Sequence, residues 1–161
     1  MKENQYFVYI MSNQDHTVLY TGVTYEHMHP QRSQKIISAQ RKGREFLLNH
    51  RLYKSIQTGE ALDNKITLFS FLPRWHYDVL VVLEYFQDCR VERDERLKEA
   101  INLLERKRNP EGSWDLQNKH AGKIFFEMEQ AGKPSRWNTL RALRVLKWWM
   151  MSTAGHAAKS S

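Results

Sequence analysis

The clearest hydrophobic pattern lies near the end of the chain, in the stretch S-R-W-N-T-L-R-A-L-R-V-L-K-W-W-M from residue 135 to residue 150. Its apolar residues recur at steps of three and four, the period of an α-helix: Leu140, Leu143, Leu146 and Met150. The basic residues fall on the other side, where they suit the end of a helix: Arg141, Arg144 and Lys147. We predict an amphipathic helix that buries its leucine face and begins after Ser135, whose hydroxyl can cap the N-terminus.

An earlier stretch, P-R-W-H-Y-D-V-L-V-V-L-E-Y-F from residue 73 to residue 86, opens in the same way. Trp75 and Trp137 are 62 residues apart. With one inserted residue the later positions also correspond: Leu80 with Leu143, Leu83 with Leu146, and Phe86 with Trp149. Repetition over this length predicts a repeated supersecondary unit.

Two further segments have a helical pattern. One runs from Gln34 to Ser55, where Gly43 is a potential break, and the other runs from Asp94 to Lys107. The sequence N-P-E-G at residues 109–112 indicates a turn. The earlier copy of the repeat, which opens at Pro73, is predicted to be helical from Trp75 to about Asp88. We therefore predict a mainly α fold of four principal helices in two antiparallel pairs.

The N-terminal region has a different period. Two β-rich runs, Tyr6–Met11 and Thr17–Thr24, flank the turn-forming sequence S-N-Q-D-H, which predicts a β-hairpin. The triplets V-Y-I at residues 8–10 and Y-T-G at residues 20–22, followed by V-T, resemble the start of the GIY-YIG nuclease family.

That resemblance implies a metal-dependent endonuclease, in which a tyrosine assists proton transfer and Mg²⁺ or Mn²⁺ polarises the phosphate. The candidate catalytic residues are Tyr9, Tyr20, Gly22 and Arg32. The family arginine is expected about eight residues after the glycine, where this chain has Pro30, and Arg32 is out of register. The family glutamate has no counterpart. The alternative is a tyrosine-rich strand pair that packs on the following helix.

The region from about residue 43 to residue 149 resembles the C-terminal part of bacterial squalene-cyclase-like proteins, in the terpenoid cyclase and prenyltransferase α/α-toroid superfamily. Four stretches carry the likeness: G-R-E-F-L-L-N-H-R-L-Y, P-R-W-H-Y-D-V-L, K-R-N-P-E-G-S-W and K-P-S-R-W-N-T-L-R-A-L-R-V-L. The resemblance implies two helix pairs of an incomplete toroid. An aromatic stripe in such a fold can line a cavity. The candidate binding residues are Arg74, Trp75, His76, Tyr77, Trp114, Arg136 and Trp137. The alternative is that these residues pack against neighbouring side chains at the starts of helices.

Together these patterns predict three segments: a hairpin fragment at 1–32, a helical domain at 33–151 with a short strand near 123–128, and a flexible tail at 152–161. The length of 161 residues suits one domain. No apolar run is long enough to span a bilayer, and the N-terminus lacks a signal pattern. With a single cysteine, Cys89, which we expect to be buried, the chain fits a reducing, cytoplasmic compartment.

The formal net charge of +7 permits a nucleic-acid partner. A basic cluster beside Trp114 is the candidate surface, with solvated helix faces as the alternative: Arg106, Lys107, Arg108, Lys119, His120 and Lys123. The spacing of Cys89 and His120 does not indicate a zinc site. We expect no metal and no cofactor.

The function predicted from the sequence is a non-catalytic helical module that binds a partner or ligand through an apolar surface. A solenoid unit with only two helix pairs leaves a face uncovered, and the residues W-W-M-M at 148–151 place large apolar groups on more than one side of the last helix. The uncovered apolar face would be covered by a second copy of the chain, by another toroid chain, or by the chain's own hairpin folded back as a lid. The alternative is a GIY-YIG-type endonuclease or a nucleic-acid-binding protein.

Overall fold

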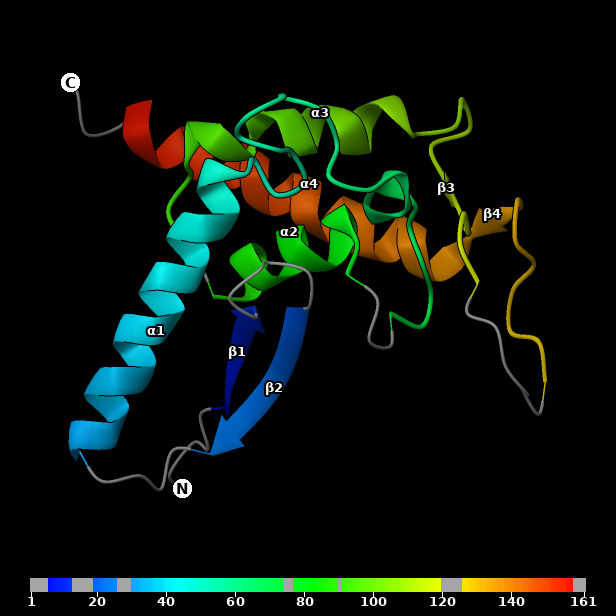
Figure 1. The fold of residues 1–161 in the computed structure, drawn as a ribbon. Coiled ribbons are helices and arrows are strands. Elements are labelled where there is room, and N and C mark those ends of the chain that lie inside the picture. Colours follow the sequence, from blue (N-terminus) through cyan, green and yellow to red (C-terminus); the bar gives the residue numbers. More distant parts are fainter. Residues whose placement is uncertain are drawn as a thin grey trace, which may run out of the picture. The chain divides into compact units, whose positions relative to one another are not determined.

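The computed structural model describes residues 6–12, 19–25, 30–73, 77–89, 91–119 and 126–157, and the side chains of those that lie between 34 and 151. The chain forms two compact units, Met1–Asn49 and His50–Ser161 (Figure 1). The fold is mainly helical, as predicted, and its described residues form two two-stranded antiparallel sheets, of which the first is the predicted hairpin. The division after Asn49 differs from the predicted boundary between residues 32 and 33, because the first helix groups with the hairpin.

In the first unit, β1 (Tyr6–Ser12) pairs with β2 (Leu19–Tyr25), which confirms the hairpin. The helix α1 (Pro30–Asn49) contacts β1 and continues through Gly43 without a break. A two-stranded hairpin is marginally stable by itself in water, so a helix packed against it supplies needed burial. Proline suits the first helical position, since its missing N–H has no partner there in any helix.

The second unit contains η1 (Asn64–Thr67), α2 (Val79–Asp88), η2 (Glu95–Leu97), α3 (Lys98–Arg106) and α4 (Arg136–Ala157), with the short strands β3 (Trp114–Asp115) and β4 (Pro134–Ser135). The predicted first helix does not reach Ser55. It ends at Asn49, and the left-handed φ angles of Arg51 (45°) and Leu52 (70°) turn the chain. The predicted turn at 109–112 is present, with Gly112 at φ 90°.

The start of α2 corrects the predicted repeat. The helix begins at Val79 rather than at Trp75, because Asp78 is extended and its carboxylate accepts a hydrogen bond from the backbone N–H of Val81. Its counterpart in α4 is Ser135, which caps as predicted by accepting from the N–H of Asn138. The two capping residues are 57 residues apart, whereas Trp75 and Trp137 are 62 residues apart. Aligning the two tryptophans therefore does not align the starts of the two helices.

The main helix contact joins α2 and α4. Glu84 pairs with Arg141 and Asp88 with Arg144, so these two helices run in the same direction. The core between them and α3 contains Leu80, Leu83, Phe86, Ile101, Leu104, Ala142, Val145 and Trp149. Over its described residues this unit holds α2, α3 and α4, which with α1 make the four principal helices that the sequence predicted. Their grouping into two antiparallel pairs stays a prediction. The toroid arrangement remains a proposal.

The orientation of α4 corrects the predicted amphipathic faces in part, since Leu146 is buried and Arg144 and Lys147 are exposed as predicted. Leu140, Leu143 and Met150 are exposed, whereas Arg141, predicted to face solvent, is buried. At the C-terminal end, α4 continues to Ala157, beyond the predicted limit of residue 151. Residues 126–128 form no strand, and the first part of the strand predicted near 123–128 lies outside the described residues. In the described part of the chain, no helix has both the length and the hydropathy needed to cross a membrane.

Candidate functional site

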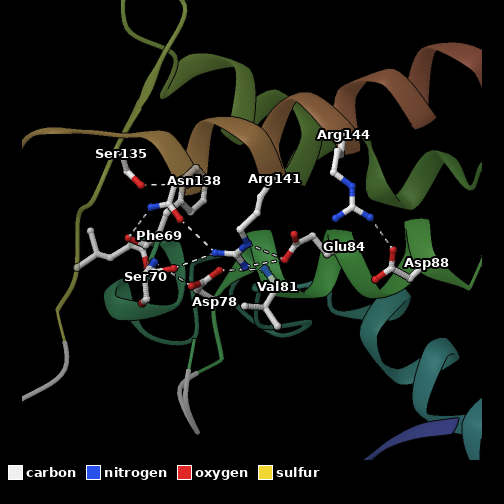
Figure 2. A network of polar contacts seen from close by, with 11 residues as sticks. Phe69, Ser70, Asp78, Val81, Glu84, Asp88, Ser135, Asn138, Arg141 and Arg144 are labelled. Atoms are coloured by element: carbon white, nitrogen blue, oxygen red, sulfur yellow. Dashed lines mark hydrogen bonds and ion pairs between the residues drawn. The ribbon is translucent and has the colours of Figure 1, made fainter. Parts of the chain in front are cut away.

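The inner face of α4 is organised around the guanidinium of Arg141, which is 7% exposed. Its Nε donates to Oε2 of Glu84 at 2.8 Å, and its Nη1 donates to the backbone carbonyl of Ser70 at 2.9 Å and to Oδ1 of Asn138 at 3.1 Å (Figure 2). A buried guanidinium is tolerated only when its charge and donors are partnered. Arg141 therefore connects α4 to α2 and to the loop before α2.

Asp78 secures that loop from the other side. Its Oδ2 accepts from the N–H of Ser70 and its Oδ1 from the N–H of Val81, both at 3.0 Å. Burial raises the pKa of Asp78, while the backbone N–H groups and the nearby Arg141 oppose that shift. The carboxylate thus caps α2 and holds Ser70, whose carbonyl receives Arg141.

The N-terminus of α4 is fixed by three further residues. Nδ2 of Asn138 donates to the carbonyls of Phe69 at 3.4 Å and Asp115 at 3.1 Å, and Ser135 Oγ accepts from the N–H of Asn138 at 3.0 Å. Glu129 accepts from the N–H of Arg136 at 2.9 Å. Together with Arg141, these bonds set the rotation of α4 about its own axis.

The chemistry of this network is that of a positioning device. The carboxylates of Asp78 and Glu84 are engaged by backbone N–H groups or by Arg141. Over the part of the chain that the structure describes, no group of three or more His, Cys, Asp or Glu side chains is arranged to hold a metal ion.

The opposite side, called here the outer face of α4, carries five large apolar side chains: Trp137 (39% exposed), Leu140 (51%), Leu143 (45%), Met150 (63%) and Met151 (65%). Three cations lie among them on the same side: Arg136, Arg144 and Lys147. The face extends onto the loop before α2, where Phe71 stacks on Trp137 with ring centroids 5.1 Å apart and planes 8° apart. Leu72, next to Phe71, is also exposed.

The candidate binding residues have different locations. Arg136 and Trp137 lie on the outer face of α4, whereas Arg74, Trp75 and His76 lie outside the described residues. The hydroxyl of Tyr77 donates to the carbonyl of Leu52, and burial raises its pKa.

Trp114 is fully buried and its Nε1 donates to the carbonyl of Leu104 at 2.7 Å. It therefore cannot stack on a nucleic-acid base, which corrects the prediction of an aromatic platform in the basic cluster. The ammonium of Lys107 donates a hydrogen bond to Oε1 of Gln117 at 2.7 Å, and burial lowers the pKa of Lys107. Cys89 is exposed, contrary to the predicted buried position.

The candidate nuclease residues belong to the first unit. In the hairpin, Tyr9 is opposite Gly22, and Tyr20 is opposite Met11. Arg32 lies in the first turn of α1, two residues after Pro30. Their side chains are outside those described, so the structure does not test whether they converge.

The sequence interpretation missed the three polar residues that orient α4: Asp78, Asn138 and Arg141. A signal was present for one of them. An aspartate directly before the apolar run V-L-V-V-L is a typical N-cap. No sequence signal indicates that Arg141 differs from Arg144.

Comparison with known proteins gave no match, whether to family models, to curated proteins or to solved structures.

Proposed function

We propose that this chain is a non-catalytic helical module, a partial α/α toroid of the squalene-cyclase-like type, which binds a protein partner through the outer face of α4. The observation that carries the proposal is the set of five exposed large apolar side chains on one side of a single helix. Contiguous apolar surface of this kind marks association sites in soluble proteins.

The buried network strengthens the proposal. Because Arg141, Asn138 and Ser135 fix the rotation of α4, the apolar side chains are held outward rather than left exposed by chance. A face held in one orientation loses less entropy on binding than a mobile one. Full burial of a leucine or methionine contributes about 1.5–3 kcal/mol before the costs of association.

The aromatic pair adds an anchor. Trp137 stacked on Phe71 is a rigid, half-exposed group beside the exposed Arg136. Tryptophan and arginine dominate the energetic centres of protein interfaces. In the toroid that the sequence resembles, the next helix pair would cover such a face, and here we propose that a partner does.

The test compares Leu140→Glu/Leu143→Glu with the matched control Ile56→Glu/Leu62→Glu, in which somewhat more exposed apolar residues outside α4 receive the same charges. All three proteins should have the same circular-dichroism spectrum and urea midpoint. We expect the unmodified chain to bind a hydrophobic dye, and only the α4 variant to lose that dye binding by several-fold.

An unmodified chain that binds no dye would contradict the proposal. So would an equal loss of dye fluorescence in the control, because the apolar surface would then not be centred on α4.

A further inference from the structure

We propose that the partner segment taken by the outer face of α4 is an acidic amphipathic helix of another protein. This inference rests on the function proposed above and specifies the chemistry of the occupant. Its basis is the way in which apolar and basic side chains alternate on that face.

The exposed apolar positions follow the spacing of a coiled-coil seam. Leu140, Leu143, Lys147 and Met150 are separated by three, four and three residues, so they form a narrow stripe with a single cation inside it. Such a seam fits one helix lying along another. Arg136, four residues before Leu140, continues the stripe at its N-terminal end, and Arg144 lies beside it, where flanking charges select the partner.

The charge of this surface has one sign. The helix from Arg136 to Ala157 contains no aspartate or glutamate, and three of its four cations, Arg136, Arg144 and Lys147, lie on the outer face, whereas Arg141 is buried on the inner face. The nearest carboxylates offset part of this charge, with Asp88 3.3 Å from Arg144 and Glu129 3.8 Å from Arg136. Lys147, in the middle of the stripe, is the cation that a partner carboxylate would meet first.

This pattern disfavours the other occupants. A second copy that placed its α4 on this one would bring like charges together, which costs free energy. A membrane surface requires basic residues at the edge of the apolar face rather than inside it, and Lys147 lies inside. Nucleic acid would set phosphates against the exposed Leu140 and Leu143, and the ring of Trp137 is already stacked on Phe71.

The geometry also indicates what the partner helix contains. Leucine or aromatic side chains at the seam would cover Leu140 and Leu143, and an apolar residue at one end would rest on the Phe71–Trp137 pair. Glutamates on either side of that seam would meet Arg144 and Lys147. Charge complementarity of this kind acts on association rate and on partner choice.

The experiment is a selection with displayed helical peptides, each long enough to span α4. Every peptide has the same leucine seam, and the flanking positions vary among Glu, Gln and Lys. Three baits are used as full chains: the unmodified protein, Leu140→Glu/Leu143→Glu, and Lys147→Glu/Arg144→Gln. These positions are exposed, so the variants should keep the unmodified circular-dichroism spectrum.

We expect the unmodified chain to enrich Glu over Lys by about tenfold or more, and the Lys147→Glu/Arg144→Gln chain to lose or reverse that preference. Enrichment that requires Leu140 and Leu143 but shows no charge preference would overturn the acidic partner while leaving the docking surface in place. Enrichment no greater than on the Leu140→Glu/Leu143→Glu chain would overturn the docking surface itself.

Discussion

At the scale of the residue, Arg141 and Arg144 show how position changes the role of one side-chain type. They are one helical turn apart on α4, and each pairs with a carboxylate of α2. Arg141 is buried and bonds to a side chain of its own helix and to a backbone carbonyl as well, whereas Arg144 is half exposed. Water screens the second pair but not the first.

We therefore predict very different effects of two identical substitutions. Arg141→Ala leaves Glu84 largely buried without its cation, so it should lower the free energy of unfolding by about 3–5 kcal/mol. Arg144→Ala, the matched control, should cost about 1 kcal/mol or less. Urea denaturation of both variants measures the difference, and similar losses would show that Arg141 does not hold the inner face.

Tyr77 predicts how stability changes in alkali. Burial raises its pKa above the ordinary value of 10.0, so the folded chain keeps the phenol proton at a pH where the unfolded chain has lost it. The folded state then binds more protons, and stability falls as pH rises above 10. The expected slope from this group is about 1.4 kcal/mol per pH unit.

The substitution Tyr77→Phe removes that slope. At neutral pH it should cost about 1 kcal/mol, because the hydrogen bond to the carbonyl of Leu52 is lost. Above pH 10 the variant should lose stability more slowly than the unmodified chain, as measured by urea midpoints at successive pH values. Parallel slopes in the two proteins would mean that Tyr77 ionises equally in both states.

At the scale of the element, capping and burial decide where helices begin and which way they face. Pro73 and Trp75 gave a plausible start for α2, but the side chain of Asp78 satisfies a backbone donor only if the helix begins at Val79. In α4 the cap at Ser135 matches the sequence pattern, whereas the buried face does not.

The reason for the difference lies in the two stripes that α4 offers. One contains Leu140, Leu143 and Met150, and the other contains Ala142, Val145 and Trp149. Both have helical spacing, and periodicity does not rank them. The second stripe is buried because it includes Asn138 and Arg141, whose hydrogen bonds hold that side against α2 and its preceding loop.

At the scale of the whole molecule, the two units coincide roughly with the two family resemblances. The hairpin with the triplets V-Y-I and Y-T-G belongs to the unit Met1–Asn49, and most of the sequence from which we propose a toroid belongs to His50–Ser161. The units therefore permit separate functions, and the nuclease resemblance of the first unit has its own experiment.

For the first unit we predict no metal-dependent cleavage of DNA. Pro30, at the position expected for the family arginine, is the first residue of α1 and supplies no cation to a phosphate. Pure full-length protein incubated with plasmid and Mg²⁺ or Mn²⁺ should leave the plasmid supercoiled. Nicking that disappears in Tyr20→Phe would reverse this prediction and restore the nuclease interpretation.

The sequence by itself determined the local features of this protein. Alternating β-rich residues predicted the hairpin, periodic apolar residues predicted four helical segments, and Ser135 and the N-P-E-G turn marked helix ends. These features depend on interactions between residues close in the chain, so they can be read from short windows.

Only the tertiary structure decided which surfaces are used. Arg141 reaches Ser70 and Glu84, 71 and 57 residues away, and these partners turn the more leucine-rich side of α4 outward. Trp114 is buried because α3 supplies a carbonyl to its indole N–H. The free energy of burying a charge or an indole depends on such distant partners, and local periodicity carries no information about them.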